Sequence, residues 1–186
     1  CYEGMLNANG PDLQRFLFWS GMLSGLAGFT YGAGGMFFFE TPERRFGPSP
    51  SGDTWSRHGW REALNFPGSA QVGLAKRFLE RYPWWQLEAH PEWIKPGATR
   101  PEDRAPYAAG LPDATRIAYF PDPLPHWRPR QSLALEAGVK YRAFFFDPAN
   151  GERHDLGAIE ADPTGLWRIP PTPVLQDFVV LAEPAR

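Results

Sequence analysis

The pattern of hydrophobic and polar positions changes once along the chain and separates two kinds of structure. No residue between Phe16 and Phe39 is charged, which indicates a segment buried inside a larger structure. Within it, apolar side chains recur at helical spacing from Leu13 to Leu26. Pro11-Asp12 stands just before them, and a proline in the first turn followed by an acid is typical of a helix start. The pattern therefore predicts a buried helix.

Two short β-like runs follow this helix, on either side of a glycine cluster. Phe29 to Tyr31 and Met36 to Phe39 are the kind of run expected of strands covered on both faces in a parallel sheet. Tyr2-Glu3-Gly4, before the helix, reads as the end of another strand. The order strand, helix, strand is the βαβ unit of an α/β protein. An amphipathic helix is then predicted from Ala70 to Arg81.

From Pro106 onward the hydrophobic period becomes two, which predicts strands. The stretch from Asp147 to Gly151 is a hairpin signal, because it combines a proline turn with a glycine at the position that needs a positive φ. Evenly spaced short strands with proline-rich turns predict a small antiparallel β-sandwich. The expected strands are 107–109, 115–120, 132–135, 140–147, 153–159, 166–169 and 178–182.

These patterns predict an α/β fold followed by an all-β fold. We expect an α/β part over residues 1–94, a linker rich in proline and charge over 95–105, and the β-sandwich over 106–186. The 186 residues are enough for one ordinary domain or two small ones. Because the chain opens on what looks like a strand end, we expect a fragment that lacks its N-terminal portion.

Composition and charge limit the partners. The net charge is -2 and no basic stripe is visible, which argues against nucleic acid and anionic membranes. A membrane helix within the charge-free stretch is disfavoured because Gly28, Gly32, Gly34 and Gly35 interrupt it. The single cysteine excludes an intrachain disulfide, so the compartment stays open between cytosol, periplasm and medium. The four histidines are scattered, and we predict no metal and no cofactor.

Several motifs resemble the apiosidase-like glycoside hydrolases, which have a TIM barrel. The motifs are Tyr2-Glu3-Gly4, Gly28-x-Thr30-Tyr31-Gly32-Ala33, Trp60-x-x-Ala63-Leu64, Pro67-Gly68-Ser69-x-Gln71 and Arg81-Tyr82-Pro83-Trp84-Trp85. The β-rich tail resembles the module that follows that barrel and is named for collagen binding; it carries Tyr119-Phe120-Pro121, Phe145-Phe146-Asp147-Pro148-x-x-Gly151 and Asp177-Phe178-Val179-Val180-Leu181. The chain departs from the family pattern at Phe29, where a histidine is usual.

The resemblance implies the C-terminal portion of a (β/α)8 barrel followed by the β module. Its partners would be a carbohydrate substrate and the missing N-terminal part of the same barrel. Glycoside hydrolysis generally uses two carboxyl groups, which a TIM barrel places at the C-terminal ends of strands. Glu3 occupies such a strand end. The family motif has a second glutamate slightly upstream, so Glu3 is either the catalytic carboxylate or its neighbour in the sugar pocket.

Aromatic residues near the expected strand ends are candidates for substrate binding. Tyr2 is the neighbour of Glu3, and Tyr31 could hydrogen-bond a sugar or the catalytic carboxylate, or be an ordinary core tyrosine. Trp55 and Trp60 border the long loop after residue 40 and could stack on sugar faces, although most tryptophans are packing residues. Glu40 is expected to be solvated.

Two functions of different class follow. The first is a fragment of a glycoside hydrolase that acts on the side chains of plant-type polysaccharides and contributes part of the sugar site. Such a fragment alone is expected to be inactive. The second is a module without catalytic activity, in which the β part binds glycan or collagen or braces the barrel.

Overall fold

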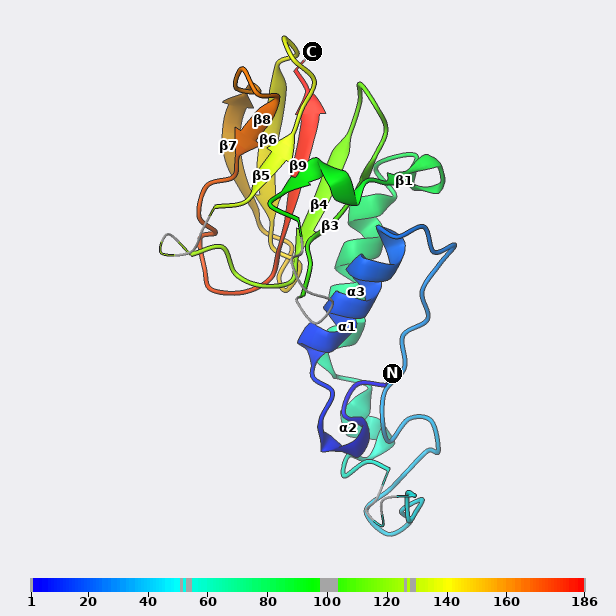
Figure 1. Ribbon diagram of the computed structural model, residues 1–186. Helices are drawn as coiled ribbons and strands as arrows, with labels where there is room; N and C mark the ends of the chain where they lie inside the picture. The colour runs from blue at the N-terminus through cyan, green and yellow to red at the C-terminus, as the bar shows by residue number, and fades with distance from the viewer. Residues whose placement is uncertain are drawn as a thin grey trace.

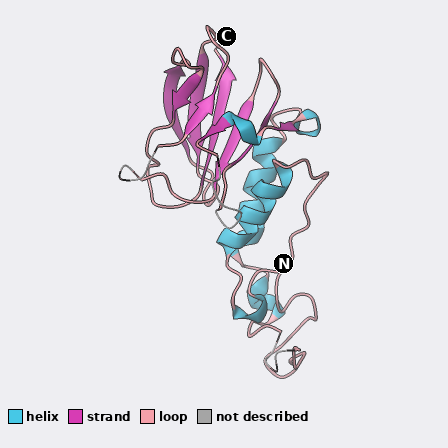
Figure 2. Cartoon of the chain, viewed as in Figure 1, coloured by secondary structure: helices cyan, strands magenta, loops and turns pink. Residues whose placement is uncertain are grey.

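The computed structural model describes residues 2–50, 52, 55–97, 104–125, 127 and 130–185. Its strands gather in one half of the molecule, two longer helices lie against them, and the N-terminal end beyond these helices is mostly loop (Figures 1 and 2). Among the described residues, no helix has both the length and the apolar character needed to cross a membrane.

The β region consists of two antiparallel sheets. The larger has the strand order β1-β3-β4-β9-β6-β7 and the smaller the order β2-β5-β8. Central pairing is continuous, with Tyr119 opposite Val179 and Phe145 opposite Val180. The strands are β1 (Glu88–Ala89), β2 (Ile94–Lys95), β3 (Tyr107–Gly110), β4 (Arg116–Phe120), β5 (Ser132–Ala134), β6 (Tyr141–Phe146), β7 (Arg153–Ile159), β8 (Leu166–Arg168) and β9 (Phe178–Pro184).

The seven strands predicted after Pro106 are confirmed, and each end lies within two residues of its expected place. The hairpin signal before β7 is also confirmed, because the Gly151 amide donates to the Asp147 carbonyl at 2.8 Å and Gly151 has a φ of 84°. β1 and β2 were not predicted. They pair with β3 and β5 respectively. These two short strands therefore belong to the sheets, although the predicted α/β part extends to residue 94.

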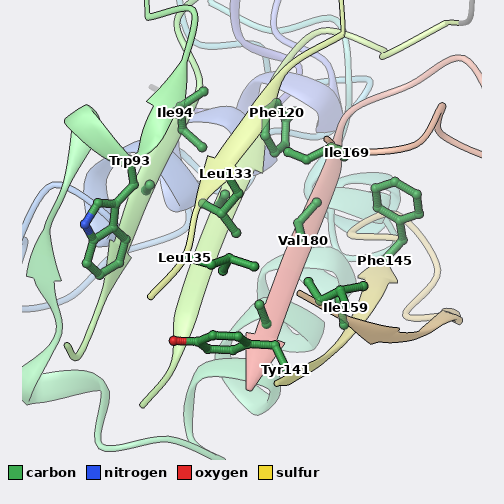
Figure 3. Packing of buried hydrophobic residues seen from close by; sticks show 14 of the residues in the cluster. Trp93, Ile94, Phe120, Leu133, Leu135, Tyr141, Phe145, Ile159, Ile169 and Val180 are labelled. Carbon is green, nitrogen blue, oxygen red and sulfur yellow. The ribbon is translucent and has the colours of Figure 1, made fainter. Parts of the chain in front are cut away.

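The larger sheet is covered on both faces. On one face it shares a core with the small sheet, to which Leu133, Phe145 and Val180 contribute (Figure 3). On the other face, β-strand residues such as Phe144 and Leu181 pack with the helices α1 (Pro11–Met22) and α3 (Pro67–Leu79). Burial on both faces explains the apolar runs from Ala143 to Phe146 in β6 and from Phe178 to Ala182 in β9.

Trp19 is the centre of the helix–sheet layer. It is fully buried, and its ring lies 5.5 Å from Phe78 on α3 and 6.1 Å from Tyr119 on β4 between centroids. The two predicted helices are confirmed with shifted ends. α1 ends at Met22 rather than Leu26, because the chain reverses through Gly25, whose φ is +93°. α3 begins at Pro67, three residues before the expected start.

The two strands predicted after α1 are wrong. Phe29 to Tyr31 forms no strand, and Met36 to Phe39 is a turn in which the Phe39 amide donates to the Met36 carbonyl at 3.1 Å. The parallel contact found here is an isolated bridge between Glu3 and Ala33. An apolar run alone cannot distinguish a buried strand from a buried turn. Most of the predicted linker, residues 98–103, lies outside the described residues, and the barrel portion of the predicted fold stays a prediction.

The remaining elements are short. They are α2 (Trp60–Ala63) and the 3-10 turns η1 (Met5–Asn7), η2 (Trp84–Gln86) and η3 (Pro91–Trp93). α2 has four residues. Together with η1 it lies in the loop-rich end of the molecule, beyond the N-terminal ends of α1 and α3 (Figure 1).

Candidate functional site

The backbone around Glu3 is fixed by its parallel bridge to Ala33. The Glu3 amide donates to the Gly32 carbonyl at 3.0 Å, and the Gly34 amide donates to the Glu3 carbonyl at 2.7 Å. Gly4 follows with a φ of +68°, a left-handed conformation that suits glycine and turns the chain away from the bridge. The Glu3 side chain is 3% exposed. Its position therefore does not depend on a flexible surface rotamer.

Two donors from distant parts of the chain bind the Glu3 carboxylate. The Tyr31 hydroxyl donates to Oε2 at 2.7 Å, and the Gly68 amide donates to Oε2 at 3.0 Å and to Oε1 at 3.3 Å. Gly68 lies in the first turn of α3, where free amides and the helix dipole favour a negative charge. Both groups donate, so the carboxylate is used as an acceptor, as a base or nucleophile would be.

Gly68 is required by the close approach of the carboxylate. A β-carbon at this position would lie 2.2 Å from Glu3 Oε2 and 3.1 Å from Gln14 Cγ on α1. No other residue leaves room for the side chains of Glu3 and Gln14 while keeping the hydrogen bond from its backbone amide to the Glu3 carboxylate. The glycine of the Pro67-Gly68-Ser69 motif therefore has a steric reason within this site.

The environment of Tyr31 keeps its hydroxyl protonated. Burial is the largest cause that raises the pKa of Tyr31 well above its ordinary value, and the hydrogen bond and charge of Glu3 raise it further. A neutral hydroxyl can donate to the carboxylate throughout the physiological range. Of the roles left open for Tyr31, the structure shows the hydrogen bond to the Glu3 carboxylate.

A cavity of about 390 Å³ adjoins Glu3. Its volume is within the range of small-molecule sites. Asn9 and His58 supply polar side chains to the wall, and the Asn9 amide nitrogen donates to the Tyr2 carbonyl at 3.3 Å. The His58 ring nitrogen Nδ1 lies 2.7 Å from Glu62 Oε1. The lining residues are Glu3, Gly4, Ala8, Asn9, Gly10, His58 and Phe66.

The other predicted substrate residues are not gathered on this cavity. The ring of Tyr2 lies against Gly32 and 5.3 Å from the Phe37 ring. Trp55 is half-buried, and its carbonyl accepts from the Leu6 amide at 2.8 Å. Trp60 lines a separate cavity of about 440 Å³, with the Arg61 guanidinium 4.4 Å from its ring centroid. Substrate binding by these three aromatics stays a prediction.

The expectation that Glu40 is solvated is wrong. Its side chain is 1% exposed, and neither carboxylate oxygen has a hydrogen-bond partner among the described residues. Arg45 Nη1 lies 3.7 Å from Oε2 and supplies the nearby positive charge. The Glu40 backbone is held by Gly35 and Trp60, since its amide donates to the Gly35 carbonyl and its carbonyl accepts from the Trp60 amide, each at 2.8 Å. This fold-back buries the side chain.

Two site residues were missed as such by the sequence pattern. Gly68 appears in a motif, but nothing in its local sequence indicates a partner 65 positions away. Asn9 precedes a helix, and its residue type suggests a helix N-cap. In the structure Gly10 is the N-cap and Asn9 lines the cavity. Among the described residues, no three His, Cys, Asp or Glu side chains are grouped as a metal site would need.

Comparisons with known proteins find similarity to glycoside hydrolases. Residues 1–86 match the family model described as "Apiosidase-like, catalytic domain". A solved structure described as "Glycoside hydrolase" matches 99% of this chain and 41% of its own, with a TM-score of 0.79 and 17% identity. A glycoside hydrolase family 5 structure from Bacteroides vulgatus matches 98% and 40%, with a TM-score of 0.78 and 17% identity. No curated protein matches. The chain spans about two fifths of these solved structures, and at this identity they show the fold alone.

Proposed function

The chain has a family relationship to the apiosidase-like glycoside hydrolases, and on that premise we propose that it forms the C-terminal part of an enzyme that hydrolyses O-glycosidic bonds. Residues 1–94 would complete a (β/α)8 barrel and contribute part of its sugar site. The substrate class would be the side chains of plant-type polysaccharides. The family match over residues 1–86 supports the class of enzyme, and the geometry around Glu3 supports the site.

The observation that carries this proposal is the buried carboxylate of Glu3, which accepts hydrogen bonds from two donors. Glycoside hydrolysis uses one carboxyl group as acid and another as nucleophile or base. Glu3 accepts from Tyr31 and Gly68 and borders a cavity, which suits the nucleophile or base. The acid would then come from another strand end of the complete barrel. If a glutamate upstream of Cys1 does the chemistry instead, the same bonds make Glu3 its fixed neighbour in the sugar pocket.

The partner of this chain would be the preceding part of the same barrel. Leu26, Phe37 and Phe39 are 54%, 56% and 71% exposed, and Phe46 is 51% exposed. Soluble proteins rarely leave large contiguous apolar patches uncovered. These side chains lie in and after the charge-free stretch whose sequence predicts burial. The solved glycoside hydrolases are more than twice as long as this chain, which leaves ample chain to cover them.

The test of the function uses the longer natural protein that contains this chain. Glu3→Gln keeps the shape of the side chain and removes its charge. If Glu3 is the nucleophile or base, release of sugar from pectic side chains should fall by at least about 100-fold. Glu80→Gln is the matched control, because Glu80 is exposed at the end of α3 and pairs only with Lys76 at 3.2 Å among the described residues.

The possible results separate the two roles of Glu3. A large loss with Glu3→Gln and none with Glu80→Gln supports a catalytic role. If the adjacent upstream glutamate is the catalyst, its glutamine variant should lose more activity than Glu3→Gln. Normal hydrolysis by both variants would contradict the proposal.

A bracing role for the β region is the second candidate, and it is favoured by the buried contacts between the layers. α1 and α3 pack against β3, β4, β6 and β9 on one face of the larger sheet. Arg15 on α1 also forms an ion pair with Asp177, just before β9, at 2.7 Å. Bracing predicts that the whole chain binds neither polysaccharide nor collagen in a pull-down assay. Capture of either polymer, lost on competition with the same soluble polymer, would favour ligand binding instead.

A further inference from the structure

A buried polar network connects the β region to the helix that binds Glu3. Asp177 is 7% exposed, and its carboxylate accepts from Arg15 Nε at 2.9 Å, from Arg15 Nη2 at 2.7 Å and from the Tyr119 hydroxyl at 3.1 Å. Burial lowers the pKa of Arg15, but the hydrogen bond and charge of Asp177 outweigh it and raise the pKa above its ordinary value. The Arg15 guanidinium is therefore charged, and two of its nitrogens fix it on the Asp177 carboxylate.

The network continues from α1 into α3. The third donor group of Arg15, Nη1, donates to Gln71 Oε1 at 2.8 Å. Gln71 lies three residues after Gly68, so both belong to the first turns of the same helix. One guanidinium thus holds Asp177 of the β region with two nitrogens and α3 with the remaining one.

The first turn of α3 also approaches α1 closely. A β-carbon on Gly68 would meet both Gln14 of α1 and the carboxylate of Glu3. A small movement of α3 along α1 would therefore change the distance from the Gly68 amide to Glu3. Arg15, next to Gln14, opposes such a movement through its bond to Gln71.

We propose that Asp177, Arg15 and Gln71 are positioning residues that hold the first turn of α3 so that the Gly68 amide binds the Glu3 carboxylate. The β region is then part of the mechanism that orders the site, because it supplies Asp177. The catalytic meaning of this positioning depends on the proposed function of Glu3, whereas the positioning itself is a structural claim that can be tested without activity.

The test follows single amides of this chain by NMR and hydrogen exchange. Gln71→Met keeps the size of the side chain and the Arg15–Asp177 pair but removes the bond to α3. We expect the Gly68 amide proton resonance to move upfield and the amide to exchange at least about 10-fold faster relative to Ala75, in the middle of the same helix. Tyr119→Phe is the matched control, because it removes a donor to Asp177 that does not reach α3.

Asp177→Asn should produce the same selective change as Gln71→Met. If Asp177→Asn does not fold, the pair Gln71→Met and Tyr119→Phe decides alone. An unchanged Gly68 amide in Gln71→Met, or an equal acceleration at Gly68 and Ala75, would overturn the proposal, since the latter indicates only a loss of global stability.

The complete enzyme separates this inference from the proposed function. If both hold, Gln71→Met should lower kcat with little change in KM, because Glu3 is misplaced for chemistry rather than for binding. If the Gly68 amide responds but Glu3→Gln leaves hydrolysis normal, the positioning stands and the proposed role of Glu3 fails. If Glu3→Gln abolishes hydrolysis but the Gly68 amide does not respond, the proposed role of Glu3 stands and the positioning fails.

Discussion

The β region and the loop-rich N-terminal region both contain apolar runs of similar strength, but only the β region buries them. Phe145 and Phe178 are 1% and 0% exposed between the layers. Phe37 and Phe39, from an equally aromatic run, are 56% and 71% exposed. The difference is the number of layers available: β6 and β9 have a sheet on one face and helices on the other, whereas residues 36–39 have little of this chain around them. Apolar sequence predicts burial, but the covering layer can lie elsewhere.

The largest expected effect compares one phenylalanine from each region. Phe145→Ala should lower the free energy of unfolding by about 3–5 kcal/mol, because it leaves a cavity in the core between the sheets. Phe39→Ala should change it by no more than about 0.5 kcal/mol, because the ring is mostly in solvent. Urea unfolding of both variants measures the difference. Similar losses would mean that Phe39 is buried in this chain, and the contrast between the regions would be wrong.

A smaller effect is expected at Gly68, where α3 meets Glu3 of the N-terminal region. Alanine is normally the better helix former, but here its methyl group would collide with Glu3 Oε2. We expect Gly68→Ala to destabilise the chain by about 1–3 kcal/mol, the usual cost of overpacking. Gly73→Ala is the control within the same helix, because a β-carbon there would meet nothing closer than the end of Arg77 at 3.5 Å. A stabilising Gly68→Ala would contradict the close contact with Glu3.

The smallest effect at neutral pH concerns the buried tyrosines. Burial raises the pKa of Tyr31, Tyr82 and Tyr119 above the ordinary value, and a nearby carboxylate raises each of them further. Their contribution to stability is fully present below the unfolded pKa of about 10 and is lost as the pH rises above it toward the folded pKa values.

This predicts that the unfolding free energy is flat from neutral pH to about pH 9 and falls in stronger alkali. Tyr119→Phe should remove more of the alkaline decline than Tyr31→Phe, since Tyr119 is fully buried in the helix–sheet layer and Tyr31 is half-buried in the N-terminal region. Urea unfolding of both variants across this pH range measures the two slopes. An equal response would remove this distinction between the regions.

The parts of the fold that the sequence predicts are those with local signals. Period-two alternation and turn residues locate the seven strands after Pro106, and helical spacing locates α1 and α3. β1 and β2, each of two residues, carry no such period. The runs after α1 look like strands because their apolar character is real, while their conformation depends on neighbours that local sequence does not describe.

The candidate site is less predictable because it is made of distant contacts. Glu3 and Tyr31 could be named from the resemblance, but their hydrogen bond joins residues 28 positions apart. Gly68 comes from 65 positions away, and the Arg15–Asp177 pair spans 162. The burial of Glu40 likewise results from a fold-back onto Trp60. Each of these is a tertiary contact with no periodic signal.

Hydrogen exchange can test the proposal that the N-terminal region is the incomplete edge of a glycoside hydrolase domain. The measurement compares this chain alone with the longer natural protein that contains it. We expect the amides of residues 26–46 to become at least about 10-fold more protected in the longer protein, while the β6 and β9 amides stay unchanged. Equal exchange of residues 26–46 in both would contradict it, because their apolar side chains would then have no covering partner.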